Sequence, residues 1–467
     1  MAQAPPHEPQ VDPTAYLQQG GIIEDWDAYE ELWRSSFRTL RVTDTLKHTT
    51  GGGGRRNDSL EPPPNKQAKT TNSTTIRNNN NASAMEVDGM CVHPLLTVDP
   101  AYASMNHDGT AGAANVVSRA KQLERHTEIL MESLGAPACF VAPAPVLAAF
   151  ACGRQTCTVI DVGSSGCRVT PIVDGLILQH SQRRNGRGGD WLGNIAWKAL
   201  PPSNQNKNDG RIRPRYQLRP DYHNNNDDDK TATTTALHRW AMQEMFYELR
   251  TTEQVRLELY RTQGYEVPFL QTSRNNPNGS NSNNDAGSSN NNAGTNDEED
   301  SSMTNSYKLP DGTVVDWDSP LGKDLSRIPE LLFADQTPFV ESSSSSSSSR
   351  LGVHKSLSNQ PLHKLVHESL SAVGDADVRK DLCGNMVLVG ASSLFPNTEQ
   401  RLSHEISSVV TGNVKCRVVA SRHTVERSCA SWIGGSILTS LGSFQQLWLS
   451  KSEYEEYGAK LAIQRFP

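Results

Sequence analysis

The sequence predicts an α/β protein whose folded body is interrupted by long insertions. Apolar runs followed by small-residue turns, such as the run that ends at Asp161 and the run over Met386–Val389, are typical of buried strands. They alternate with segments in which apolar residues recur at helical spacing. Other stretches are dominated by Asn, Ser, Gly and Asp and bury too little apolar surface to offset chain entropy. We expect these stretches to be disordered insertions: 48–88, 202–235, 273–304 and 341–350.

The composition narrows the classes of function. Among 467 residues there are 45 Lys and Arg and 52 Asp and Glu, and the net charge is −7, which opposes nucleic-acid binding through the charge of the whole chain. No apolar run reaches membrane-spanning length, and the start, MAQAPPHEPQ, is unlike a signal peptide. The eight cysteines form no CxxC pair, which favours reduced thiols in the cytosol or nucleus over disulfides or a zinc site.

The first ordered segment is expected to be an amphipathic helix capped by Asp25. Its apolar residues return at roughly helical spacing: Trp26, Tyr29, Leu32, Trp33 and Phe37. The elements expected next are a strand and turn over 93–102, a helix over 119–134, a strand over 139–143 and a small-residue helix over 145–153.

The stretch TCTVIDVGSSGCRVTPIVDG predicts a β-hairpin with an exposed Gly/Ser-rich tip. Small side chains at the tip leave backbone N–H groups open to an anion such as phosphate. Asp161 precedes the tip, where a carboxylate can hold the water shell of Mg²⁺. The alternative is a plain hairpin with a flexible turn. The tip residues are Gly163, Ser164, Ser165 and Gly166.

The stretch MVLVGASSLFPNTEQRLSHEI predicts a strand, a small-residue turn and a helix over 396–406 with Asn397 or Thr398 as its cap. This arrangement can offer a helix N-terminus to phosphate, or backbone to a flat base. Neither turn matches a GxGxxG or P-loop pattern. Two phosphate-type turns in one chain still favour a nucleotide held between two lobes.

The stretch SWIGGSILTSLGSFQQLWLSKSEYEEYG places a Gly-Gly pair inside an apolar run. Gly434 and Gly435 have no Cβ, so the backbone there can closely approach another backbone or a ligand. The residues alone favour a core turn, with Trp432 in the core, followed by an amphipathic surface helix that includes Lys451.

These segments resemble the actin superfamily over most of the chain outside the insertions. Within it, YKLPDGTVVDWDSPLGKDLSRIPELLF and HTVERSCASWIGGSIL are similar to the nuclear actin-related protein 4 type. The resemblance implies a two-lobed actin-like fold of duplicated ribonuclease H-like domains. It also implies a nuclear scaffold subunit of chromatin-remodelling and histone acetyltransferase complexes that acts in transcription regulation.

The resemblance also implies a division of the chain. We expect a tail at 1–19, a first actin-like lobe at 20–47 and 89–201, second-lobe helices and strands at 236–272 and 305–340, and a C-terminal part at 351–467, with the four insertions between them.

Site residues follow from the same resemblance. The second phosphate loop falls on Asp161, Gly163, Ser164 and Ser165. The loop beside the adenine and phosphates falls on Gly390, Ala391, Ser392, Leu394 and Phe395, with Phe395 where the family has an aromatic beside the base. The implied cofactor is ATP, weakly bound and not hydrolysed, with Mg²⁺ only alongside nucleotide and no separate metal site.

Several positions depart from the family pattern. Ala144 stands where actin has the glutamine that orients water, and Arg168 stands where it has a partner histidine. The usual basic residue before the tryptophan signature falls near Ser428, beside Arg427. MAQAPPHEPQVDPTAYLQQ contains no first phosphate loop, so an N-terminal part is expected to be missing. We therefore expect no catalytic residues and no enzyme.

The same departures from the family pattern bear on two alternative functions. A cytoskeletal actin-like ATP-binding protein explains the fold but not Ala144 or Arg168. A sugar-kinase-like enzyme needs a carboxylate base aimed at a hydroxyl, and the sequence offers only surface acids.

The resemblance further implies the partners. Trp432, Ile433, Leu447 and Trp448 are expected to border a groove for a long amphipathic helix. The expected occupant is a helical segment of a chromatin-remodeller ATPase, with conventional actin alongside, nucleosomes or histones reached through the complex, and no membrane.

Overall fold

The computed structural model describes residues 23, 25–40, 91, 93–99, 113–199, 255, 257, 306–309, 314–335, 360–410 and 414–466. The expected tail at 1–19, the four expected insertions and nearly all of 236–272 lie outside these residues. Within them, no helix is both long and apolar enough to cross a membrane.

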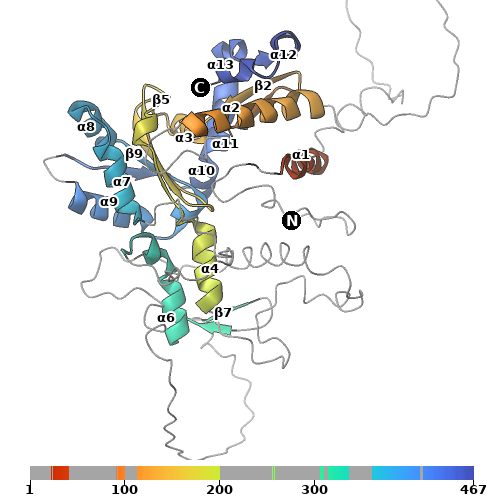
Figure 1. The fold of residues 1–467 in the computed structure, drawn as a ribbon. Coiled ribbons are helices and arrows are strands. Elements are labelled where there is room, and N and C mark those ends of the chain that lie inside the picture. The colour runs from red at the N-terminus through yellow and green to blue at the C-terminus, as the bar shows by residue number, and fades with distance from the viewer. Residues whose placement is uncertain are drawn as a thin grey trace, which may run out of the picture.

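A six-stranded mixed sheet forms the centre of the described structure (Figure 1). Its strands are β10 (Val418–Ala420), β9 (Met386–Val389), β3 (Cys157–Val162), β4 (Cys167–Val173), β5 (Leu176–Ile177) and β6 (Arg183–Asn185). β10, β9 and β3 run parallel, whereas β4 is antiparallel to β3, β5 and β6. The predicted α/β class and the hairpin are confirmed.

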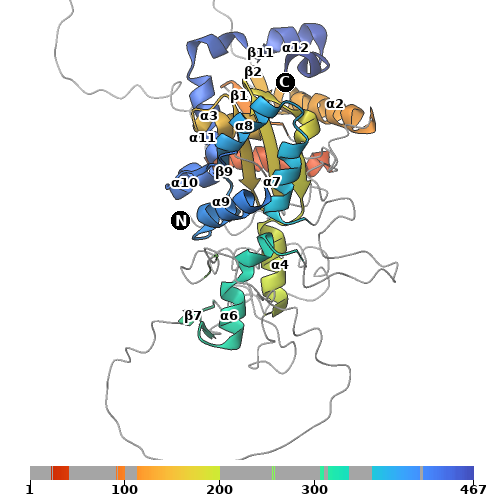
Figure 2. The same cartoon turned by 90° about the vertical axis from the view of Figure 1, so that its left-hand side faces the viewer.

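Helices pack on both faces of this sheet. Successive residues of a strand point to opposite faces, so one strand contributes side chains to two separate cores. Ile160 and Val162 belong to the main core, formed with α4 (Gly189–Ala199), α7 (Leu362–Ser371), α8 (Ala376–Gly384) and α9 (Thr398–Val409). Val159 and Val389 face the opposite side, in a smaller core with α3 (Ala144–Ala151) and α11 (Ala430–Thr439). Figures 1 and 2 show α3 and α11 side by side, across the sheet from α7.

A second unit lies beyond α3. Its three-stranded sheet has the order β1 (Leu95–Val98), β2 (Ala138–Ala142) and β11 (Leu449–Ser450). The helices around it are α1 (Trp26–Leu40), α2 (Ala113–Glu128), α12 (Lys451–Tyr457) and α13 (Leu461–Arg465). The Ala28 N–H donates to the Asp25 carboxylate at 2.9 Å, which confirms the predicted helix cap.

Short elements complete the described chain. They are β7 (Ser306–Lys308), β8 (Val314–Asp316), α6 (Pro320–Ser326) and α10 (Thr424–Ser428), a π-helical turn over Ile129–Ser133 that continues α2, and 3₁₀ turns over Gln179–Ser181, Ile328–Leu332, Ala391–Leu394 and Gly442–Gln446.

Two features of the C-terminal stretch differ from the sequence prediction. Gly434 and Gly435 lie inside α11 and form no turn. The predicted close approach is correct, since a Cβ on Gly434 would lie 1.8 Å from the carbonyl oxygen of Leu147 in α3. Trp432 is 76% exposed rather than in the core, because only the glycine face of α11 packs on α3.

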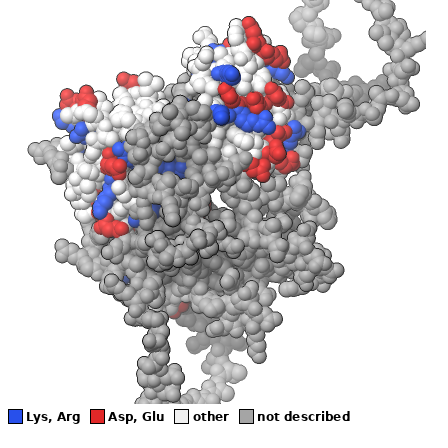
Figure 3. Space-filling model, viewed as in Figure 1, with Lys and Arg blue, Asp and Glu red and all other residues white. Residues whose placement is uncertain are grey.

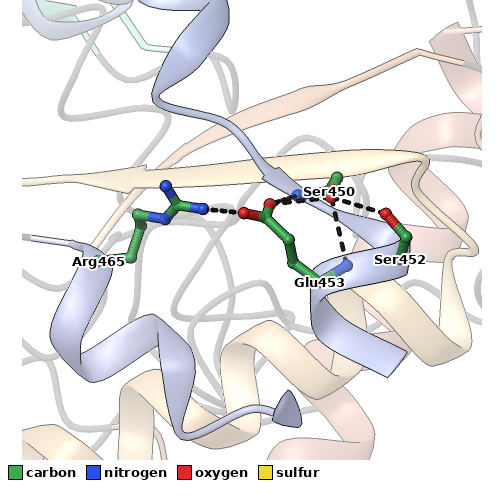
Figure 4. A network of polar contacts seen from close by, with 4 residues as sticks. All are labelled: Ser450, Ser452, Glu453 and Arg465. Atoms are coloured by element: carbon green, nitrogen blue, oxygen red, sulfur yellow. Dashed lines mark hydrogen bonds and ion pairs between the residues drawn. The ribbon is translucent and has the colours of Figure 1, made fainter. Parts of the chain in front are cut away.

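The predicted surface helix begins at Lys451, after the strand β11. Ser450 and Glu453 form a capping box: the Ser450 hydroxyl accepts from the Glu453 N–H at 3.3 Å, and the Glu453 carboxylate accepts from the Ser450 N–H at 2.9 Å (Figure 4). Arg465 of α13 also pairs with Glu453, so one carboxylate joins the last two helices.

Candidate functional site

The two predicted loops meet at one end of the central sheet. β3 and β9 are neighbouring parallel strands, with Asp161 opposite Val389. Gly390 follows β9 with φ of 95°, and a Cβ there would lie 2.5 Å from both Asp161 Oδ1 and the Val162 carbonyl oxygen. Both loops are therefore at the carboxyl ends of adjacent strands of one sheet, and only glycine fits between them.

The hairpin tip is exposed but firmly held. The Gly163 N–H donates to the Gly166 carbonyl at 3.0 Å, which closes the turn. The N–H groups of Gly189 and Asp190, at the start of α4, donate to the carbonyls of Gly163 and Ser164, each at 3.0 Å. The Ser164 hydroxyl also donates to the Asp190 carboxylate. These bonds argue against the alternative of a flexible turn.

The tip can still offer donors to an anion. Ser164 and Ser165 are exposed, and among the described residues their amides donate no backbone hydrogen bond. Adjacent free amides on a fixed turn are the arrangement that binds phosphate oxygens.

A charged row crosses the sheet beside the tip. Arg168 is directly opposite Asp161, and Arg184 is directly opposite Arg168. Directly opposed residues of antiparallel strands share a face, which here is the face that carries Val159. Burial raises the pKa of Asp161, while the positive charges of Arg168 and Arg184 act in the opposite direction. Burial and the charge of Arg168 lower the pKa of Arg184 to about 9.

The second loop is mostly committed to packing. Ala391 is exposed and Leu394 half-buried, but Ser392 is buried. Phe395 is 4% exposed and belongs to the main core, so its ring does not stand open beside the loop. Asn397 occupies the N-cap position of α9 with φ of 69°, but its side chain bonds the Leu257 carbonyl at 2.9 Å and caps no amide.

The described residues line a cavity of about 100 Å³ between the ends of β3 and β9, α10 and the starts of α3 and α11, and the hairpin-tip residues 163–166 are not part of its lining. Its full lining is Ala144, Pro145, Ala148, Val159, Asp161, Val389, Gly390, Arg427, Ser428, Ala430 and Ser431. No local sequence pattern points to Ser431, because its position depends on the packing of α11 on α3.

Most polar groups around this cavity are already bonded. The Arg427 guanidinium donates to the carbonyls of Ser393 at 3.1 Å and Ser421 at 3.0 Å. The Ser431 hydroxyl donates to the Ala144 carbonyl at 3.0 Å. These bonds hold α10, α11 and α3 around the cavity.

The residues present fit a phosphate group better than a whole nucleotide. A cavity of about 100 Å³ is below the roughly 300–1,000 Å³ of ordinary ligand pockets. The tip amides suit phosphate oxygens. For Mg²⁺ the site supplies the single carboxylate of Asp161, and the described residues hold no cluster of three or more metal-binding side chains. Mg²⁺ with few protein ligands is typical when nucleotide phosphates complete its shell.

The residues predicted to line a partner groove differ in how far they are exposed. Trp432 is 76% exposed in the first turn of α11, whereas Leu447, 46% exposed, follows the 3₁₀ turn beyond the other end of that helix. Ile433 is half-buried. Trp448 packs edge-to-face on Phe444, with ring centroids 5.0 Å apart. The described surface in Figure 3 shows Lys and Arg interspersed with Asp and Glu, without a large area of one sign.

Comparison with known proteins gives a consistent result. The family model described as Actin matches residues 3–467. Actin-related protein 4 of Oryza sativa subsp. japonica is 30% identical over 384 residues, which cover 80% of this chain and 71% of that protein. Actin-related protein 4 of Arabidopsis thaliana is 25% identical over 452 residues, covering 96% and 78%. That of Saccharomyces cerevisiae is 28% identical over 379 residues, covering 72% and 74%.

Proposed function

Because this chain belongs to the actin family, we propose that it serves as a non-catalytic scaffold subunit of nuclear chromatin-remodelling and histone acetyltransferase complexes. The resemblance of its 307–333 and 423–438 segments to nuclear actin-related proteins supports the nuclear assignment. The observation that carries the scaffold role is the exposed Trp432 on an otherwise anchored helix.

Helix α11 is well suited to present a partner surface. Its glycine face lies against α3, where a Cβ on Gly434 would overlap the Leu147 carbonyl, so its backbone is fixed close to the sheet. The opposite side exposes the large ring of Trp432. A rigidly held, exposed tryptophan costs solvation free energy and is typical of a binding hot spot.

The proposed partner is an amphipathic helix of a remodeller ATPase, with conventional actin alongside and nucleosomes or histones reached through the complex. Such a helix binds by placing apolar side chains into a groove at helical spacing. Trp432 and Leu447 lie near opposite ends of α11, whose ten residues span about 15 Å. A long helix can contact both, whereas a short peptide cannot.

The second part of the proposal is that ATP is bound weakly, with Mg²⁺ only alongside it, and hydrolysed at a negligible rate. Ala144 lines the cavity, and its methyl group can neither orient nor polarise a water molecule. Arg168, opposite Asp161, is a permanent cation that cannot accept a proton from the attacking water. Acid–base or orienting groups supply on the order of 10²–10⁴-fold in rate, so losing them leaves little hydrolysis.

The partner proposal is tested by affinity purification of the tagged full chain from nuclear extract, followed by mass spectrometry. We expect a remodeller ATPase and conventional actin to co-purify. Trp432→Glu should lose them while retaining the wild-type circular dichroism spectrum, since an exposed position tolerates a charge. The matched control is Val314→Glu, an exposed aliphatic residue on β8 that should change nothing. Retention of both partners by Trp432→Glu and by Leu447→Glu would contradict the groove.

A further inference from the structure

Two cysteines meet where α8 approaches the edge strand β10. Cys383 lies in the last turn of α8, and Cys416 precedes β10 by two residues. The Arg417 N–H donates to the Cys383 carbonyl at 2.9 Å, and the Met386 N–H donates to the Arg417 carbonyl at 3.0 Å. β10 then continues parallel to β9 with Val418 opposite Met386. The backbones that carry the two cysteines are therefore fixed side by side.

The two side chains belong to the same core, with Cys383 inside it and Cys416 packed against it, and both thiols are reduced. The Cys416 Sγ also contacts the Val414 carbonyl oxygen at 3.9 Å. The Arg417 N–H that bonds the Cys383 carbonyl belongs to the peptide unit directly after Cys416, so the two cysteines are backbone neighbours. A disulfide needs such proximity, with roughly 4.4–6.8 Å between Cα atoms.

The two thiols differ in access to solvent. Cys383 is 1% exposed, whereas Cys416 is half-buried. A cavity of about 330 Å³ opens beside them and is lined by Lys380, Asp381, Gly384, Val414, Lys415 and Arg417. Cys416 is thus the thiol that a small oxidant reaches first, and Cys383 is the one held behind it.

The burial of the two thiols supports the same order of reaction. Burial raises the pKa of both thiols, to about 11 for Cys383, so Cys383 remains protonated until its partner has reacted. The hydrogen bond from Cys383 lowers the pKa of Cys416.

We propose that Cys383 and Cys416 form a reversible intramolecular disulfide that fastens α8 to the edge strand β10. The oxidant is a peroxide. The Cys416 thiolate attacks hydrogen peroxide, the O–O bond breaks, and Cys416 becomes a sulfenic acid as hydroxide leaves and is protonated to water. The Cys383 sulfur then attacks the Cys416 sulfur and loses its proton, and a second water leaves. Two thiols are oxidised by two electrons and one peroxide is reduced to two waters.

The bridge acts on a segment that leads to the other sites. β10 is an edge strand that pairs only with β9 among the described strands, and it is followed by α10 and α11. Arg427 of α10 lines the cavity by Asp161, and α11 carries Trp432. The disulfide restricts the motion of the segment that leads into α10 and α11. The proposal does not depend on the proposed function.

The test uses the purified full chain, treated with hydrogen peroxide, alkylated and mapped by mass spectrometry. We expect alkylation of Cys383 and Cys416 to be lost together, with a peptide pair 2 Da lighter than the sum of its reduced halves that dithiothreitol restores. Cys416→Ser should leave Cys383 fully alkylated after peroxide. The matched controls are Cys152→Ser and Cys429→Ser, which remove exposed thiols and should leave the cross-linked peptide unchanged.

Mass-spectrometric mapping of the oxidised wild-type chain tests the disulfide directly, even where a cysteine variant folds poorly. Full alkylation of both cysteines after peroxide would overturn the proposal. So would a sulfinic acid on Cys416 with Cys383 still alkylated, or a disulfide from either residue to a different cysteine.

Discussion

Two glycines, Gly434 and Gly390, allow backbone to approach backbone, and they do so in different settings. Gly434 sits in a helix, at ordinary helical geometry, against the Leu147 carbonyl of α3. Gly390 has a positive φ at the end of a strand and lies against the carboxylate of Asp161 and the carbonyl of Val162. At Gly434 a larger residue is excluded only by lack of space. At Gly390 it is excluded both by lack of space and by the positive φ of the backbone.

The comparison shows how one helix serves two sites. α3 accepts α11 at Leu147, and its first residue, Ala144, lines the cavity by Asp161. The Ser431 hydroxyl also bonds the Ala144 carbonyl at 3.0 Å. The surface that exposes Trp432 and the cavity beside Asp161 therefore share one rigid support. A substitution that disturbs the α3–α11 contact should therefore change both the Trp432 surface and the cavity. One that disturbs the β3–β9 contact should change mainly the cavity.

The largest effect is expected from Gly434→Ala. The added methyl group would lie 1.8 Å from a backbone oxygen, and neither helix can yield without moving away from the sheet. We expect the free energy of unfolding to fall by roughly 3 kcal/mol or more, measured by urea titration. Gly374→Ala is the control, since a Cβ there meets nothing within 4 Å. Equal stability of the two variants would show that α11 is not anchored in this way.

Gly390→Ala should lower the free energy of unfolding somewhat less, by roughly 2–3 kcal/mol. The Asp161 side chain can move away from the added methyl group, although the Val162 carbonyl cannot. Thermal unfolding followed by circular dichroism measures this loss of stability. Gly175→Ala is the appropriate control: Gly175 also has positive φ, 80°, but open space around it. If both substitutions cost the same, backbone strain alone matters and the contact between the loops does not.

A third substitution tests the hairpin tip without touching either glycine contact. A Cβ on Gly188 would lie 2.1 Å from the Ser164 carbonyl and 2.2 Å from the Gly166 nitrogen, so Gly188→Ala should displace the tip. We expect affinity for ATP to fall about 10-fold, or ~1.4 kcal/mol, by isothermal titration calorimetry. Gly442→Ala, at an open position far along the chain, serves as the control. Unchanged affinity in Gly188→Ala would remove the tip from the phosphate site.

The smallest effect is expected from Asp161→Asn, and its sign is stabilising. Burial raises the folded-state pKa of Asp161. A carboxyl of this kind contributes stability below its unfolded pKa and loses it as the pH rises through the folded pKa. At pH 7 the amide should therefore raise the free energy of unfolding by roughly 0.5–1 kcal/mol, and the gain should shrink near pH 4. Asp381→Asn, at an exposed site, should change stability little at either pH.

The sequence was most informative where a local pattern decides the structure. The Asp174–Gly175 turn, with φ of 51° and 80°, follows from the residue types that tolerate positive φ. Asp25 likewise marked the start of α1. Each of these depends on neighbours within a few residues.

The remaining features depend on contacts that are distant in sequence. The Gly-Gly pair indicated a turn because glycine disfavours helix, but packing against Leu147 overrides that preference. β11 pairs with β2 through Leu449 and Cys139, and no local sequence pattern predicts this pairing. The burial of Phe395 and the position of Ser431 in the cavity likewise follow from how whole elements pack. The site's loops could be named from the sequence, but their mutual arrangement could not.

The most direct test of the account is steady-state phosphate release by the purified chain at saturating ATP and Mg²⁺. Ala144 and Arg168 leave the cavity without a group that orients or deprotonates water. We predict release at the background rate, in parallel with measurable but weak ATP binding in the same preparation. Turnover comparable to that of a filament-forming actin would contradict the assignment of a non-catalytic scaffold.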